Sequence, residues 1–355
     1  MDTERASEAV LCSRSLSSRF RLTGRALQGN FASAVLVASD VGDSTEVVVK
    51  VMMKDGLGTE LERKSALAEA SIHGGLLPHP NVVRLLASEE TPDAIMLVTP
   101  FMHDGDLWGL MEYGQTFGEA QVRNCAGQML SALRHLHDIS GLIHADIKPH
   151  NFLLSKFDQG FIVQLCDFGF SERPGPGGEV TFYMVRGTSG WFSPEMLGHR
   201  NYGYAIDLFG VGLIIFRMLG GYAPFDPPSR FQATVQYDKR CWCHIGDVCR
   251  SFTSQLLSLQ PADRGTAAEA FEHPWLSGPE PEMPTSSQLA ILTAYGPPPN
   301  FSVEFCPADR VPAPTWCPCD AELSTAAGTR WGSFADEASG CESPPNSPIT
   351  PASRF

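Results

Sequence analysis

Two acidic motifs, separated by some twenty residues, constrain this chain more than any other feature of its sequence. The first, HADIKPHN, occupies residues 144–151, and the second, DFG, occupies residues 167–169. The second motif closes the apolar run FIVQLCDFG, which is typical of a buried strand that ends in a turn. A lone DFG indicates only such a turn. The two motifs together indicate a shared chemical role.

The residue types in these motifs suit phosphoryl transfer. That reaction needs a carboxylate to orient the attacking hydroxyl and accept its proton, and oxygen ligands to hold Mg²⁺ against the phosphates. An Asp, an Asn five positions later and a second Asp can provide both. The pattern resembles the catalytic loop and metal-binding motif of eukaryotic protein kinases. The resemblance implies that Asp146 is the base, that Lys148 reaches the transferring phosphate, and that Asn151 and Asp167 hold Mg²⁺.

Further motifs follow in the order that the kinase family has them. VVVK, residues 47–50, resembles the strand whose lysine holds the nucleotide phosphates, and Glu69 has the spacing of the partner of Lys50. Read without the resemblance, both would be solvated surface charges. The segment GTSGWFSPE, residues 187–195, resembles the end of the activation segment, and Arg264 lies where the family's arginine pairs with Glu195. The resemblance covers about residues 20–276.

The resemblance also implies an ATP site between two lobes. LVTPFMHDGDLW, residues 97–108, is similar to the hinge, with Thr99 at the gatekeeper position. Pro100 would offer adenine its carbonyl, which proline retains, and Met102 would offer its amide. The remaining residues expected around the nucleotide are those that sandwich the adenine ring or form the phosphate loop: Leu27, Ala34, Val48 and Leu153 for the ring, and Gly29 and Phe31 for the loop.

Hydrophobic periodicity predicts an α+β fold with a small strand-rich half and a larger helix-rich half. The resemblance implies the two-lobed protein kinase fold, with a small β-rich N-lobe and a larger α-helical C-lobe. Apolar runs predict strands, and longer stretches with helical spacing predict helices. The strands are expected at 34–39, 46–51 and 94–98, and the helices at 60–73 and 120–137. The expected organisation is a flexible extension at 1–19, a kinase domain at 20–276 (N-lobe about 20–99, hinge about 100–103, C-lobe about 104–276) and a Pro/Ser-rich, mostly disordered tail at 277–355.

The charge and the apolar segments of the chain limit which partners and compartments we expect. The net charge of −14 argues against binding to nucleic acid, which requires a basic surface. The longest apolar stretch, residues 208–219, is too short to span a membrane. With no secretory signal, we expect a cytoplasmic or nuclear protein with reduced thiols. Cys241, Cys243, His244 and Cys249 lie close in sequence, but their spacing fits no familiar zinc pattern. The expected partners are ATP, protein substrates and, for the Ser-Pro and Thr-Pro pairs at 343, 347 and 350, a proline-directed kinase.

Lys148 and Thr188 point to serine/threonine specificity. The sequence as a whole is most similar to the calcium/calmodulin-dependent group, without an EF-hand pattern.

Several positions depart from the family. Leu27 and Ala32 replace loop glycines, which predicts weak ATP binding. Ala145 replaces an arginine that binds a phosphorylated activation segment, and His150 replaces a glutamate that reads basic substrates.

His73, one helical turn after Glu69, falls where an apolar residue normally packs near Phe168. It is either a tolerated polar substitution or a slip in alignment. The departures leave two alternatives to an active kinase. One is a pseudokinase that acts as a scaffold or allosteric binder. The other is a small-molecule phosphotransferase, which the SPE segment disfavours.

Overall fold

The computed structural model describes residues 3–27, 33–112, 117–157, 160–183, 187–225, 231 and 235–278. Gly29, Phe31 and Ala32 of the expected phosphate loop lie outside these residues. So does the tail from residue 279 onward, with its Ser-Pro and Thr-Pro pairs.

The N-lobe is built on an antiparallel five-stranded sheet in the order β1-β2-β3-β5-β4. The chain forms strands here because β-branched residues recur in short runs separated by polar turns. Val35–Leu36–Val37 of β2 pairs with Val48–Val49–Lys50 of β3, and Lys50 in turn pairs with Leu97 of β5. The five strands are β1 (Phe20–Leu27), β2 (Ser33–Asp40), β3 (Glu46–Met53), β4 (Ala87–Glu90) and β5 (Ala94–Pro100).

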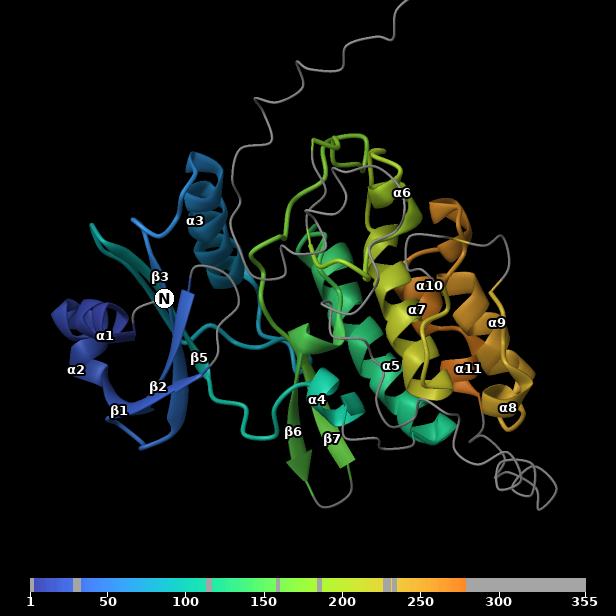
Figure 1. Ribbon diagram of the computed structural model, residues 1–355, viewed down its shortest axis with the longest axis horizontal. Coiled ribbons are helices and arrows are strands. Elements are labelled where there is room, and N and C mark those ends of the chain that lie inside the picture. Colours follow the sequence, from blue (N-terminus) through green and yellow to red (C-terminus); the bar gives the residue numbers. More distant parts are fainter. Residues whose placement is uncertain are drawn as a thin grey trace, which may run out of the picture.

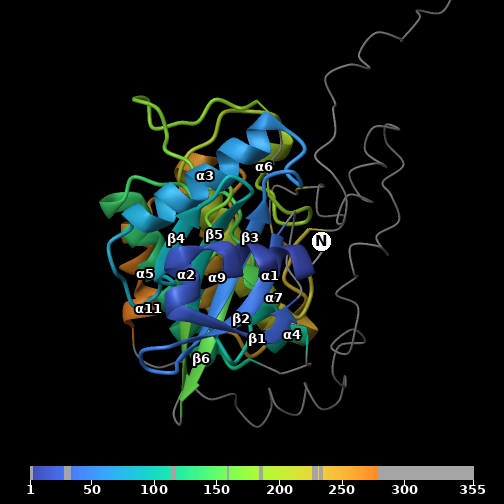
Figure 2. The ribbon, with the colours of Figure 1, turned by 90° about the vertical axis from the view of Figure 1, so that its left-hand side faces the viewer.

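Residues 3–19 are not a flexible extension, so that prediction is wrong. They form α1 (Thr3–Cys12) and α2 (Arg14–Arg19), which lie across one face of the sheet (Figure 2). Ala6, Val10 and Leu16 are buried against sheet residues that include Val49. The helices form because burial of this apolar stripe compensates for the short length of each helix.

The other face of the sheet carries α3 (Glu60–Gly75), which begins with a capping box formed by Thr59 and Glu62. In a capping box the two side chains satisfy backbone N–H groups at the helix start. The predicted helix at 60–73 is confirmed and extends two residues further. On this face Ala66 packs with Met52, Leu57, Ile95 and Leu97.

The C-lobe is helical and surrounds α7 (Ala205–Gly220), which is buried nearly all round, as a helix that is apolar on every side should be. It ends at Gly221 with φ 73°, a left-handed conformation that glycine adopts readily at a helix end. The other C-lobe elements are α4 (Leu107–Glu112), α5 (Glu119–Arg134), η1 (His135–Ile139), η2 (Pro149–Asn151), β6 (Phe152–Phe157), β7 (Gly160–Leu165), α6 (Pro194–Leu197), α8 (Lys239–Trp242), α9 (Asp247–Leu256), η3 (Pro261–Arg264), α10 (Ala267–Phe271) and α11 (Pro274–Ser277).

Figure 1 shows the two lobes side by side, with the sheet and α3 on one side and the helices around α7 on the other. The segment after β5 connects the lobes, and the β6–β7 hairpin lies beside it. This arrangement confirms the predicted two-lobed α+β fold. Among the described helices, none is long and apolar enough to cross a membrane.

Candidate active site

Asp146 lies at the centre of a compact polar cluster in the loop before η2. Its carboxylate accepts hydrogen bonds from Lys148 Nζ at 2.6 Å and from Thr188 Oγ1 at 2.9 Å. Lys148 Nζ also donates to Thr188 Oγ1 at 2.5 Å. Asn151 Nδ2 donates to the Asp146 carbonyl at 2.8 Å, which fixes the amide and would leave its oxygen as the atom available to bind a cation. The structure therefore brings together the first motif and a threonine some forty residues away.

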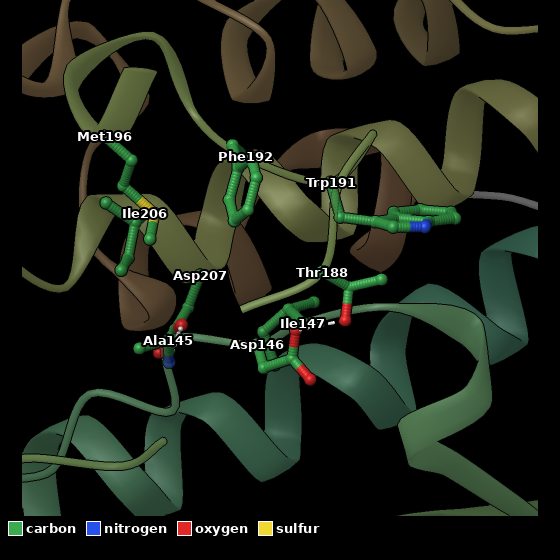
Figure 3. A pocket seen from close by; sticks show the side chains of 9 residues that line it. All are labelled: Ala145, Asp146, Ile147, Thr188, Trp191, Phe192, Met196, Ile206 and Asp207. Atoms are coloured by element: carbon green, nitrogen blue, oxygen red, sulfur yellow. Dashed lines mark hydrogen bonds between the residues drawn. The ribbon is translucent and has the colours of Figure 1, made fainter. Parts of the chain in front are cut away.

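Asp207, near the start of α7, holds the loop by accepting hydrogen bonds from its backbone (Figure 3). One oxygen of its carboxylate accepts the backbone N–H of His144 at 2.8 Å, and the other accepts that of Ala145 at 2.9 Å. His137 Nε2 lies 2.8 Å from the same carboxylate. Asp207 did not appear among the residues expected at the site. The sequence feature that could have identified it is its position near the start of an apolar helix, because a charged residue that is buried there must have partners.

A second charged cluster joins the lobes. Lys50 Nζ on β3 donates to Glu69 Oε1 of α3 at 2.7 Å and to Asp167 Oδ1 at 3.0 Å. Burial alone would lower the pKa of Lys50, but the two carboxylates outweigh it and raise that pKa. Burial likewise works to raise the pKa of Asp167, but Lys50 lowers it to about 2. The Asp167 carboxylate is therefore ionised, as a metal ligand must be.

His73 lies beside Phe168, in the place where an apolar residue was expected. Its ring centroid lies 4.8 Å from that of Phe168, and its Nε2 lies 2.7 Å from the Val83 carbonyl oxygen. Burial lowers the pKa of His73, so the ring is held in its neutral form. His144 contacts the same Phe168 ring edge-on, at 5.5 Å. The aromatic ring of the DFG motif is therefore in contact with both histidines, His73 of the N-lobe and His144 of the C-lobe.

The residues expected around adenine gather at the junction of the lobes. Val48 and Thr99 are paired across β3 and β5, and Pro100 is the last residue of β5. Ala34 is buried on β2, whereas Leu27, at the end of β1, is 38% exposed. Met102 lies in the connecting segment and Leu153 on β6 beside Asp106. The described residues that were expected around adenine therefore come from β1, β2, β3, β5, β6 and the connecting segment.

The expected pair of Glu195 and Arg264 is present. Arg264 donates to both carboxylate oxygens, at 2.7 and 2.8 Å, and both side chains are almost fully buried.

His150 stacks on Trp108 of α4 with ring centroids 4.8 Å apart. The side chain at position 150 therefore packs on an aromatic ring, where a glutamate would present a carboxylate.

The Cys241–Cys249 region holds free thiols. Within the described residues, no group of three His, Cys, Asp or Glu side chains could hold a metal ion.

Comparison with known proteins matches these features. A family model described as protein kinase domain matches residues 25–276. The calcium/calmodulin-dependent protein kinase type II subunit delta of Oryctolagus cuniculus is 31% identical over 225 residues, which cover 61% of this chain and 41% of that protein. The calcium/calmodulin-dependent protein kinase type II alpha chain of Drosophila melanogaster is 32% identical over 207 residues, 56% of this chain and 39% of that protein. The chain thus matches about two fifths of each relative's length.

Proposed function

The chain belongs to the protein kinase family, and on this premise we propose that it transfers the γ-phosphoryl group of ATP to serine or threonine hydroxyls of protein substrates. The observation that carries the proposal is the joint geometry of two clusters. Asp146 is bonded to Lys148 and Thr188, and Lys50 bridges Glu69 and Asp167. A chain released from catalysis has no reason to keep both.

Each residue of the first cluster has a task that its contacts support. Asp146 orients the substrate hydroxyl and accepts its proton during transfer. Lys148 sits within 2.6 Å of that carboxylate and places a cation where negative charge develops on the transferring group. Thr188 bonds both side chains and keeps them in register. Together Lys148 and Thr188 support serine/threonine rather than tyrosine specificity.

The second cluster supports nucleotide and metal binding. Lys50 would pair with phosphate oxygens, and its bond to Glu69 fixes its direction. The ionised Asp167 and the amide oxygen of Asn151 are hard oxygen donors of the kind that Mg²⁺ takes, so the donor set fits this ion. Bound Mg²⁺ would neutralise phosphate charge during transfer.

The test is a pair of substitutions. We expect Asp146→Asn to lower the transfer rate at least ~100-fold while ATP affinity changes little, because the base acts in the transition state. Lys50→Met should weaken both activity and ATP binding. The measurements are phosphate incorporation into a peptide library with labelled MgATP, and nucleotide titration of both variants. Equal activity in wild type and Asp146→Asn would refute the proposal.

A second candidate function is a scaffold or allosteric module that binds nucleotide without transferring phosphate. Leu27 and Ala32 favour it, because a Cβ hinders close approach of the loop backbone to phosphates. The two proposals differ in one measurable outcome. A scaffold would bind ATP and show no incorporation in wild type, and it would be indifferent to Asp146→Asn.

A further inference from the structure

The junction between α1 and α2 is fastened to the edge strand β4 through one carboxylate oxygen. Ser13 Oγ donates to Glu89 Oε2 at 2.6 Å, and Ser15 Oγ donates to the same oxygen. Ser13 Oγ also accepts the Leu16 N–H at 3.0 Å, which caps the start of α2. Ser13, Ser15 and Glu89 are called the serine–glutamate junction below. This junction ties the two helices to a strand that lies more than seventy residues away in the sequence.

The two serines of the junction differ in accessibility. Ser13 is 2% exposed, whereas Ser15 is exposed to solvent. Arginines flank Ser15 in the sequence: Arg14 is exposed, and the side chain of Arg19 is 50% exposed. An enzyme can therefore reach the Ser15 hydroxyl from solvent, and a segment with this positive charge complements an acidic groove.

We propose that Ser15 is phosphorylated by a separate serine kinase with an acidic substrate groove, and that the phosphate releases α1 and α2 from the sheet. The step forms a bond between Ser15 Oγ and the γ-phosphorus of a nucleoside triphosphate, and it breaks the bond from that phosphorus to the bridging oxygen. The nucleoside diphosphate leaves, and a base of the modifying kinase takes the hydroxyl proton. The inference does not rest on the proposed function, because this chain is the substrate of the step.

A phosphate on Ser15 would meet a negative charge that is already in place. The hydrogen bonds from Ser13 and Ser15 lower the pKa of Glu89, so its side chain is a carboxylate at neutral pH. A phosphoserine carries close to two negative charges, and it lacks the hydroxyl proton that Ser15 donates. Phosphorylation therefore replaces the bond between Ser15 and Glu89 by repulsion between like charges.

The nearby arginines are poorly placed to compensate the phosphate. Arg19 lies four residues after Ser15, a spacing at which side chains of a helix can pair. It already pairs with Asp40 of β2 at 3.0 Å, and a phosphate could take it only by breaking this second tie between α2 and the sheet. Arg14 is adjacent to Ser15, and adjacent residues of a helix do not face each other. Neither arginine therefore compensates the phosphate while α2 stays on the sheet.

The two helices depend on such ties because each is short. α1 has ten residues and α2 has six, and isolated helices of this length are unstable in water. They are ordered by Ala6, Val10 and Leu16, which pack on the sheet face that the helices cover (Figure 2). A further polar tie, between Arg5 and Asp55, is exposed on both sides and contributes little. Loss of the serine–glutamate junction therefore favours detached helices and an uncovered apolar sheet face.

The experiment compares the full chain with the same chain carrying phosphoserine at position 15, incorporated during translation. Hydrogen exchange measured by mass spectrometry reports the opening of α1 and α2. We expect the phosphate to speed exchange of the amides of residues 6–16 more than tenfold and to leave those of α5, in the C-lobe, unchanged. The matched control carries phosphoserine at position 18, where the Ser18 hydroxyl donates to the Ser15 carbonyl and not to Glu89. It should change the same rates less than threefold.

Glu89→Gln tests the cause of the release. This substitution removes the negative charge and keeps an oxygen that can accept from Ser13. Phosphoserine at position 15 should then change the exchange rates less than threefold relative to unmodified Glu89→Gln, because the repulsion is absent. Slow exchange in the phosphorylated wild type would overturn the release. An effect that is equally large at position 18, or in Glu89→Gln, would overturn it as well.

The modification itself is tested on the chain isolated from the cells that produce it. We expect mass spectrometry to detect phosphate on Ser15 in a fraction of the molecules, and phosphatase treatment to remove it. A synthetic phosphopeptide of the same sequence, added to the sample, shows that the modified form would be detected. Unmodified Ser15 alongside a detected synthetic peptide would overturn the assignment of Ser15 as a phosphorylation site.

Discussion

At the scale of single residues, the molecule places several charged groups where water cannot reach them. Arg264 and Glu195 are the extreme case, with both side chains almost completely buried and bonded twice to each other. Arg264 also donates to the Ala205 carbonyl at 2.9 Å and lies over the Phe209 ring. A buried pair of this kind is costly to break, because the remaining charge loses its oppositely charged partner.

We therefore expect Glu195→Gln to lower the free energy of unfolding by about 3 kcal/mol, near the lower end for a broken buried pair because glutamine retains one acceptor. The control is Arg5→Gln, which breaks the exposed pair between Arg5 and Asp55 and should cost under ~1 kcal/mol. Urea unfolding of both variants provides the measurement. Similar losses in the two would contradict the argument from burial.

Histidines provide a second prediction at this scale. His79 stacks on His135 with centroids 4.7 Å apart, and its Nδ1 accepts the Asn81 N–H at 3.2 Å. Burial, and then the neighbouring His135, lower the pKa of His79 below its usual 6.5, and burial lowers that of His73 as well.

A histidine with a lowered pKa in the folded state binds its proton more readily when the chain unfolds. Its contribution to stability is therefore complete above about pH 6.5 and is lost as the pH falls below that value. Each such group adds a slope of at most ~1.4 kcal/mol per pH unit. We expect His79→Gln to have a shallower loss of stability between pH 7 and 5 than wild type. An unchanged pH slope would show that His79 does not titrate in this way.

At the scale of elements, α1 and α2 support the sheet of the N-lobe. They cover the sheet face opposite α3 and link to it by polar contacts: Ser13 and Ser15 both donate to Glu89 of β4, and Arg19 pairs with Asp40. The same sheet carries Lys50 on β3, so the two helices support the strand that holds the phosphate-binding lysine.

Leu16→Ala should lower the free energy of unfolding by about 2–5 kcal/mol, because Leu16 is 2% exposed and its loss leaves a cavity against the sheet. The matched control is Leu11→Ala on the outer side of α1, where the side chain is 64% exposed and little should change. Thermal unfolding of both variants tests this. Equal stability of the two would mean that α1 and α2 contribute little to the lobe.

At the scale of the whole molecule, the described core is complete by the end of α11. Trp275 is buried there, lies tilted against the Phe252 ring with centroids 5.1 Å apart, and donates its indole N–H to Glu119 at 2.9 Å, which ties α11 to α5. We expect a chain that lacks residues 285–355 to keep the melting temperature and nucleotide affinity of the full chain. A drop of more than about 4 °C, roughly 1–2 kcal/mol for a domain of this size, would show that the tail packs on the domain.

The sequence by itself determined the fold class, the two lobes and the kinase family to which the chain belongs. The strands at 34–39, 46–51 and 94–98 and the helix at 60–73 all appear in the structure, within a few residues at their ends. These features are local in the chain: periodicity and short motifs follow from which side chains can share one face of an element. The spacing of Lys50 and Glu69 in the family's pattern likewise sufficed to predict their ion pair.

Only the tertiary structure decided what depends on a distant partner. The apolar residues of α1, Ala6 and Val10, are too few to predict a stable helix, and they are ordered because a sheet face lies beneath them. Thr188 bonds Asp146 and Lys148 across some forty residues, and Asp207 fixes the same loop from another helix. No short-range pattern records such contacts, because their free energy comes from burial and hydrogen bonding that exist only after the chain has folded.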